Sequence, residues 1–190
     1  MTFACATTAE RRVADRAGAR TALVGLGVAN GAPEGPVVSF GIAGALRDGL
    51  EIGTVLDATR VVDQDGTVLW EGGPLGVAGA EPATMLAAGD IVDDPTERRR
   101  LHELTGADAV DMESGLLART GRLHGVLRAI SDTPERKLNG LAESVTTAGN
   151  LNWSGLARAF LREPRGFVRA ATDANRALRR LGAAAKGWSR

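Results

Sequence analysis

The stretch AVDMES at residues 109–114 joins a strand candidate to a helix candidate through two carboxylates. The apolar residues up to Val110 favour a buried strand, and residues 113–119 have helical composition. Two interpretations of Asp111 and Glu113 stay open. They fit helix-start acids, because the N–H groups and dipole of a helix attract negative charge there. They also lie at the carboxyl end of a strand, where parallel sheets bind ligands.

Two further strand candidates end in a similar way. The stretch RAISD at residues 128–132 closes an apolar run and delivers a carboxylate, Asp132, at its carboxyl end. The stretch PVVSF at 36–40 is apolar and β-branched and runs into GIAGA at 41–45, which predicts a small-residue turn. Asp132 equally fits an N-cap before Thr133. If these strand ends share one edge of a sheet, their acids face a common crevice.

The rest of the chain alternates strand and helix patterns around one hairpin signal, Asp65-Gly66. Strands are expected at 3–6, 20–24, 54–62, 67–70 and 84–88, and helices at 9–14, 94–104 and in two segments after Gly155 that Pro164-Arg165-Gly166 separates. These patterns predict the α/β class, with a three-layer α/β/α arrangement around a central mixed, partly parallel twisted sheet. We expect residues 1–155 to form this domain, and 156–190 a basic helical segment packed on it or continuing it.

Length and composition limit the class of protein. The 190 residues are 44% hydrophobic and 24% charged, which fits one soluble globular domain. No apolar run approaches the roughly 18 residues of a membrane-spanning helix, and residues 1–12 make a poor signal peptide. Cys5 is the single cysteine, so we expect a reducing cytoplasm and a small packed side chain rather than a nucleophile. His102 and His124 lack partners at ligand spacing, and 41–44 lacks the glycine spacing of a dinucleotide fingerprint, so we expect no metal and no cofactor.

The formal net charge is zero, but the charges are unevenly distributed. Residues 156–190 carry nine basic and two acidic side chains, a net charge of +7, and the rest of the chain carries −7. Three interpretations of this tail stay open: a solvated helix face, packing against the acidic body, or contact with an anionic membrane, for which Trp188 would suit an interfacial anchor. We expect no nucleic-acid partner, because no aromatic platform is interleaved with the basic residues.

The motifs in 109–114, 128–132 and 41–46, with Gly53-Thr54-Val55, resemble the nucleoside phosphorylase/nucleosidase superfamily. The likeness covers about 36–181, and the mechanism of the methylthioadenosine/S-adenosylhomocysteine nucleosidases is the nearest that is understood. The tail is most similar to the hopanoid-associated branch. The resemblance implies release of adenine from a 5′-substituted adenosine, adenosylhopane first, in the cytoplasm or at the inner membrane surface. It also implies a homodimer.

The resemblance further implies roles for single residues. Asp132 would protonate the purine N7, which contributes about 10²–10⁴-fold, and Glu113 would accept hydrogen bonds from the ribose hydroxyls. Met112 would pack on the sugar. The remaining substrate-binding positions implied are Ser131, Gly44, Ile42, Asp90 and Val92. Apolar residues such as Ile42 and Met112 also fit ordinary core packing.

Glu10 is the implied base that activates water, although an exposed helix acid beside Arg11 and Arg12 fits the pattern equally well. Water is favoured over phosphate, because the phosphorolytic relatives have an Arg and a Ser where this chain has Ser39 and Ile42. Arg47 or Arg60 would weaken this preference if either reached the site. The alternatives are a methylthioadenosine/S-adenosylhomocysteine nucleosidase, a phosphorolytic version of the reaction, and a non-catalytic nucleoside- or lipid-binding relative, which the short N-terminal third and Ile42 motivate.

Overall fold

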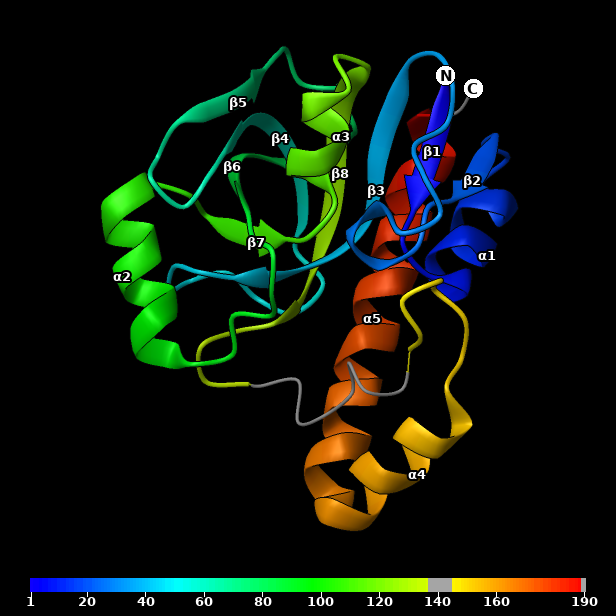
Figure 1. Ribbon diagram of the computed structural model, residues 1–190, viewed down its shortest axis with the longest axis vertical. Coiled ribbons are helices and arrows are strands. Elements are labelled where there is room, and N and C mark those ends of the chain that lie inside the picture. The colour runs from blue at the N-terminus through cyan, green and yellow to red at the C-terminus, as the bar shows by residue number, and fades with distance from the viewer. Residues whose placement is uncertain (137–144, 189–190) are drawn as a thin grey trace.

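The computed structural model describes residues 1–136 and 145–188, with eight strands that form one mixed sheet among these residues (Figure 1). The strands are β1 (Thr2–Cys5), β2 (Thr21–Leu23), β3 (Val37–Ala45), β4 (Val55–Val62), β5 (Val68–Glu71), β6 (Glu81–Ala87), β7 (Ala109–Asp111) and β8 (Leu123–Asp132). The helices are α1 (Thr8–Arg16), α2 (Pro95–Thr105), α3 (Ser114–Arg119), α4 (Trp153–Arg162) and α5 (Pro164–Trp188), with a 3-10 turn, η1, at Leu26–Val28.

Five of the strands close on themselves. The strand β3 pairs with β7 and β8, β8 pairs with β4, and β6 joins β4 to β7. Side chains alternate across each strand, so one set fills the interior of this ring and includes Ala43, Leu56, Met85 and Ile130. The sequence does not predict this closure, because it depends on pairings between strands far apart in the chain.

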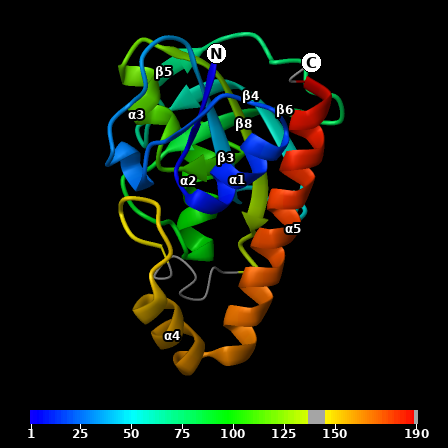
Figure 2. The same ribbon diagram turned by 90° about the vertical axis from the view of Figure 1, so that its right-hand side faces the viewer.

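Helices cover the outside of the sheet on two sides. Phe3, Phe40 and Leu127 pack with Leu181 of α5, and Leu101 of α2 packs with Leu86 of β6 and other apolar residues of the opposite side. Figures 1 and 2 show α1 and α5 on one side of the strands, with α2 and α3 on the other. The predicted α/β class and layered mixed sheet are therefore confirmed.

Two local predictions were wrong. Residues 41–45 continue strand β3 rather than forming a turn. A Cβ at Gly41 would overlap Oε1 of Glu10 and Nη1 of Arg128, so glycine is needed here for close side-chain approach and not for chain reversal. Pro164 is the first residue of α5, a position where its missing N–H costs nothing, and the break between α4 and α5 falls at Glu163.

No helix among the described residues is long and apolar enough to cross a membrane. The described part of the chain also holds no group of three or more side chains suited to a metal ion. Cys5 is fully buried in β1, and burial raises the pKa of its thiol, so it is a packed side chain as expected.

Candidate active site

The site begins at a notch along one edge of β3. Strand β1 pairs with β3 as far as Phe40, and β7 pairs with β3 only from Gly44 onward. Between these points the edge of β3 carries neither neighbour. Ile42 and Gly44 are only half-buried beside it. Three acidic side chains and one arginine gather at this notch, and we call Glu10, Asp111, Glu113 and Arg128 the carboxylate cluster.

Glu10 enters the cluster from the first turn of α1. Thr7 caps this helix and forms a capping box with Glu10, whose Oε2 accepts the Thr7 N–H at 2.8 Å. Oε1 of Glu10 accepts the N–H of Ile42 at 2.9 Å and so bridges to β3. Glu10 is only 2% exposed, and the interpretation as an exposed helix acid is therefore wrong.

Arg128 is the cation of the cluster and is fully buried in β8. Its Nη2 donates to Ser39 Oγ at 2.7 Å and to Glu113 Oε2 at 3.3 Å. Its Nε lies 2.8 Å from Asp111 Oδ2, outside hydrogen-bond geometry. Burial opposes its charge, but the nearby carboxylates outweigh burial and raise the pKa of the guanidinium.

Asp111 and Glu113 have different roles at the start of α3. Asp111 accepts the N–H of Ser114 at 2.9 Å, so the helix-start interpretation holds for this residue. Glu113 makes no cap bond; it turns to Arg128 and to the N–H of Gly27, 3.0 Å away in η1. Met112, which stands between Asp111 and Glu113 in the chain, is half-buried.

Burial is the main cause that raises the pKa of Glu113 to about 7. The Arg128 guanidinium and the Gly27 N–H act against the rise, and the carboxylates of Asp111 and Glu10 add to it. Three acidic groups thus share one buried arginine, which leaves the cluster with an excess of negative charge. A positive charge that develops on a ligand here would be stabilised.

We expect the stability of the protein to fall as pH rises from about 4.5 to about 7. A folded-state pKa above the unfolded value of 4.5 means that the native protein binds the Glu113 proton more tightly, so this contribution is lost through that window. The loss amounts to about 3 kcal/mol in the free energy of unfolding. Urea titrations at several pH values should show this slope in the parent chain and not in Glu113→Gln. The same slope in both proteins would contradict it.

Asp132 belongs to a second group, the Asp132–Arg98 pair. The guanidinium of Arg98, which is 1% exposed, donates through Nη2 to Asp132 Oδ2. Ser131 Oγ lies 2.7 Å from the other carboxylate oxygen and 3.2 Å from the Ala43 carbonyl. Asp132 therefore does not act as the N-cap proposed as one alternative. The sequence does not predict a role for Arg98 in the site, because it stands in a run of three arginines on a helix and its partner, Asp132, is 34 residues away.

The two groups lie close together on the sheet. Arg128 pairs with Gly41, and Asp132 pairs with Gly44 on the same strand. The backbone positions of the two groups are therefore about 10 Å apart along β3. Gly44 also pairs with Val110, just before Asp111. A Cβ at Gly44 would lie 2.8 Å from Asp132 Oδ2, which again explains a glycine by close approach.

The remaining predicted positions have mixed placements. The carbonyl of Val92 accepts Arg98 Nε at 2.8 Å and so borders the Asp132–Arg98 pair. Asp90 is exposed in the loop after β6. Ile42 packs against the core on the α5 side. Arg47 and Arg60 pair with Asp108 and Glu71 respectively.

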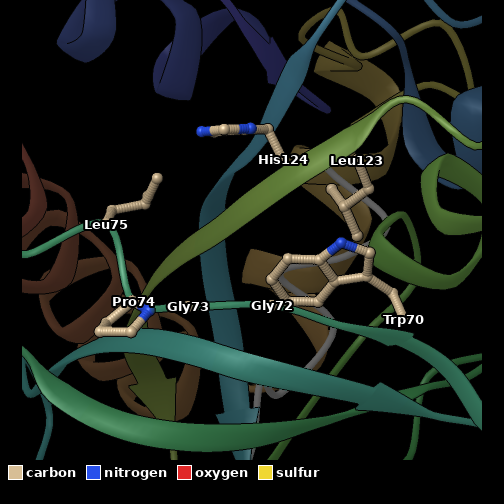
Figure 3. Close-up of a pocket in the computed structure, with 7 residues that line it drawn as sticks. All are labelled: Trp70, Gly72, Gly73, Pro74, Leu75, Leu123 and His124. Atoms are coloured by element: carbon tan, nitrogen blue, oxygen red, sulfur yellow. The ribbon is translucent and has the colours of Figure 1, made fainter.

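Two cavities of about 420 and 460 Å³ lie elsewhere on the described surface. Figure 3 shows the first, between Trp70 and His124 with Gly72, Gly73 and Pro74 along one side. Arg176 and Arg180 of α5 line the second. Neither is lined by a residue of the carboxylate cluster or the Asp132–Arg98 pair.

Solved structures share this arrangement of elements. The methylthioadenosine/S-adenosylhomocysteine nucleosidase of Helicobacter pylori is 15% identical, with a TM-score of 0.62 over 96% of this chain and 95% of its own. This chain has the nucleosidase fold. The nucleosidase of Neisseria meningitidis, in complex with methylthio-immucillin-A, is 17% identical, with a TM-score of 0.58 over 100% of this chain and 98% of its own.

A futalosine hydrolase of Helicobacter pylori is also similar, at 16% identity and a TM-score of 0.55 over 95% of each chain. No protein-family model matches the sequence, and no curated protein matches it. At these identities the likeness is one of fold.

Proposed function

We propose that this protein is an N-glycosidase that cleaves the glycosidic bond of a 5′-substituted adenosine with water and releases adenine. The observation that carries the proposal is the carboxylate cluster, in which Glu10, Asp111 and Glu113 are buried around one arginine. Breaking the bond from C1′ to N9 leaves positive charge on the ribosyl ring. An excess of buried carboxylate stabilises that charge as it develops. The nucleosidase fold supports the same reaction class.

Each acid has a part in the proposed step. Glu113 would accept hydrogen bonds from the ribose hydroxyls, and Glu10 would take a proton from the water that attacks C1′. Oε1 of Glu10 accepts one N–H bond in this structure, which leaves it lone-pair capacity for water. The electrons of the broken bond pass to the purine, and Asp132 would supply a proton to N7.

Asp132 would meet the purine through Oδ1, since Arg98 binds Oδ2. Ser131 Oγ lies 2.7 Å from Oδ1 and 3.2 Å from the Ala43 carbonyl, so this hydroxyl helps to hold the Asp132 carboxyl group in place. Met112, Gly44 and Val92 would border the nucleoside.

Water is the proposed nucleophile, because this site is poorly suited to phosphate. Arg128 is committed to Ser39, Glu113 and Asp111, and the cluster carries excess negative charge. A phosphate dianion would be repelled there and would lack paired donors. The engagement of Arg47 and Arg60 elsewhere supports the same choice.

Adenosylhopane is the first proposed substrate, from the resemblance of the C-terminal segment. Methylthioadenosine or S-adenosylhomocysteine is the second, favoured by the structural likeness to nucleosidases that act on these compounds. A homodimer in the cytoplasm, with residues 156–190 as part of the same domain, completes the proposal.

We expect chromatography to show adenine released from at least one of these three compounds, at a rate independent of added phosphate. Glu10→Gln, which lacks the proposed base, should release adenine more slowly than the parent chain. Glu81→Gln, a change at an exposed acid of β6, is the control and should keep the parent rate. Strict dependence on phosphate would overturn water as nucleophile. Tight binding of a nucleoside without any adenine release would favour the non-catalytic alternative.

A further inference from the structure

The far end of the α4–α5 hairpin exposes an unusual combination of side chains. Leu161 is 79% exposed, Val168 53% and Phe160 43%. Four exposed arginines stand near them in the chain, and Glu163 is the only acidic residue between 153 and 170. We call this surface the α4–α5 tip; it consists of Arg158, Phe160, Leu161, Arg162, Arg165, Val168 and Arg169.

Leu161 and Val168 take no part in the buried packing of the two helices. The buried side chains at this end of the molecule include Ala159, Phe167 and Ala170. Phe167 also meets the ring of Phe160 edge-on, with centroids 6.1 Å apart. Figures 1 and 2 both show the tip projecting beyond the sheet, away from the strands. Leu161 and Val168 therefore face outward at a free end of the molecule.

Exposed large apolar residues interspersed with exposed arginines match the chemistry of a bilayer interface. Leu and Phe side chains enter the boundary between headgroups and acyl chains, and arginines bind anionic headgroups. We propose that the α4–α5 tip docks on the surface of an anionic lipid bilayer. A second copy of the same tip is a poorer partner, because four arginines would face four others. This docking does not depend on the proposed reaction.

The test is sedimentation of the full chain with vesicles. The protein should bind vesicles of phosphatidylglycerol and phosphatidylcholine at low salt, bind pure phosphatidylcholine far less, and be released at high salt. Leu161→Ser should lower the partition coefficient roughly tenfold, because one leucine loses its apolar contact. The double change Arg158→Gln, Arg165→Gln should lower it about 25-fold, at about fivefold for each charge.

Two matched controls distinguish binding through the tip from nonspecific adsorption to the vesicles. Leu104→Ser changes a leucine of α2 that is 57% exposed, and Arg12→Gln changes an exposed arginine of α1. Both should bind like the parent, with unchanged circular dichroism in every variant. Failure of the parent chain to sediment with anionic vesicles at low salt would overturn the proposal, as would equal losses in the controls. If the parent chain forms a dimer that Leu161→Ser dissociates, and binds no vesicles, the tip is instead an interface with a second copy of the chain.

Discussion

Replacing Asp132 by asparagine should slow adenine release by about 10²–10⁴-fold and leave nucleoside affinity within a few-fold of the parent. The amide keeps the shape of the side chain and an acceptor for Arg98, but it cannot transfer a proton to the purine. Rates of adenine release at saturating nucleoside measure the loss, and calorimetric titration measures affinity. The substrate for both measurements is whichever of adenosylhopane, methylthioadenosine and S-adenosylhomocysteine the parent chain cleaves fastest.

The control for this prediction is Asp108→Asn. Asp108 also pairs with an arginine, Arg47 at 2.7 Å, and accepts a backbone N–H from Thr84. It lies outside the carboxylate cluster and the Asp132–Arg98 pair, so its variant should keep the parent rate. Full turnover by Asp132→Asn would remove the proton-donor role from this residue. Loss of binding together with loss of the native circular dichroism would show a structural effect only.

Replacing Arg128 by methionine should lower the free energy of unfolding by about 3–5 kcal/mol near pH 8. The change leaves Glu10, Asp111 and Glu113 buried without their cation, and each is 6% exposed or less. The deficit should shrink toward pH 5, because Glu113, whose pKa burial raises to about 7, is protonated there and no longer repels the other two carboxylates. Urea titrations at the two pH values measure both effects.

Two comparisons make the Arg128 prediction specific. Arg47→Met removes an arginine whose side chain is 34% exposed, and it should cost about 1 kcal/mol or less. Adding Glu113→Gln to Arg128→Met should recover part of the loss, since one buried charge is removed. Similar small losses for Arg128→Met and Arg47→Met, independent of pH, would show that the cluster carries no buried charge excess.

The sequence predicts the local elements of this protein well, because its signals are local. The Asp65-Gly66 hairpin, Pro95 at the start of α2 and the strand that ends at Asp132 are all found. The run GIAGA predicts a turn but forms a strand, since glycine in a strand and glycine in a turn look alike until the neighbouring side chains are known. Gly41 makes room for Glu10 and Arg128, which lie 31 and 87 residues away.

The acids of the candidate site were found, and most of their partners were not. A strand that ends in a carboxylate pointed to Glu113 and Asp132. Nothing local distinguishes Arg98 from its neighbours Arg99 and Arg100, yet Arg98 alone of the three is buried. The capping box between Thr7 and Glu10 was a readable signal for the burial of Glu10, because it fixes the carboxylate at the helix start beside β3.

The proposed function requires that one nucleoside touch both the carboxylate cluster and the Asp132–Arg98 pair. A crystal structure of Asp132→Asn soaked with methylthioadenosine would measure this. The expected result is a single ligand whose ribose hydroxyls lie within hydrogen-bond distance of Glu113 and whose purine N7 faces residue 132. A ligand that contacts Glu113 while its base points away from residue 132, or that binds in the cavity beside Trp70, would refute the shared site.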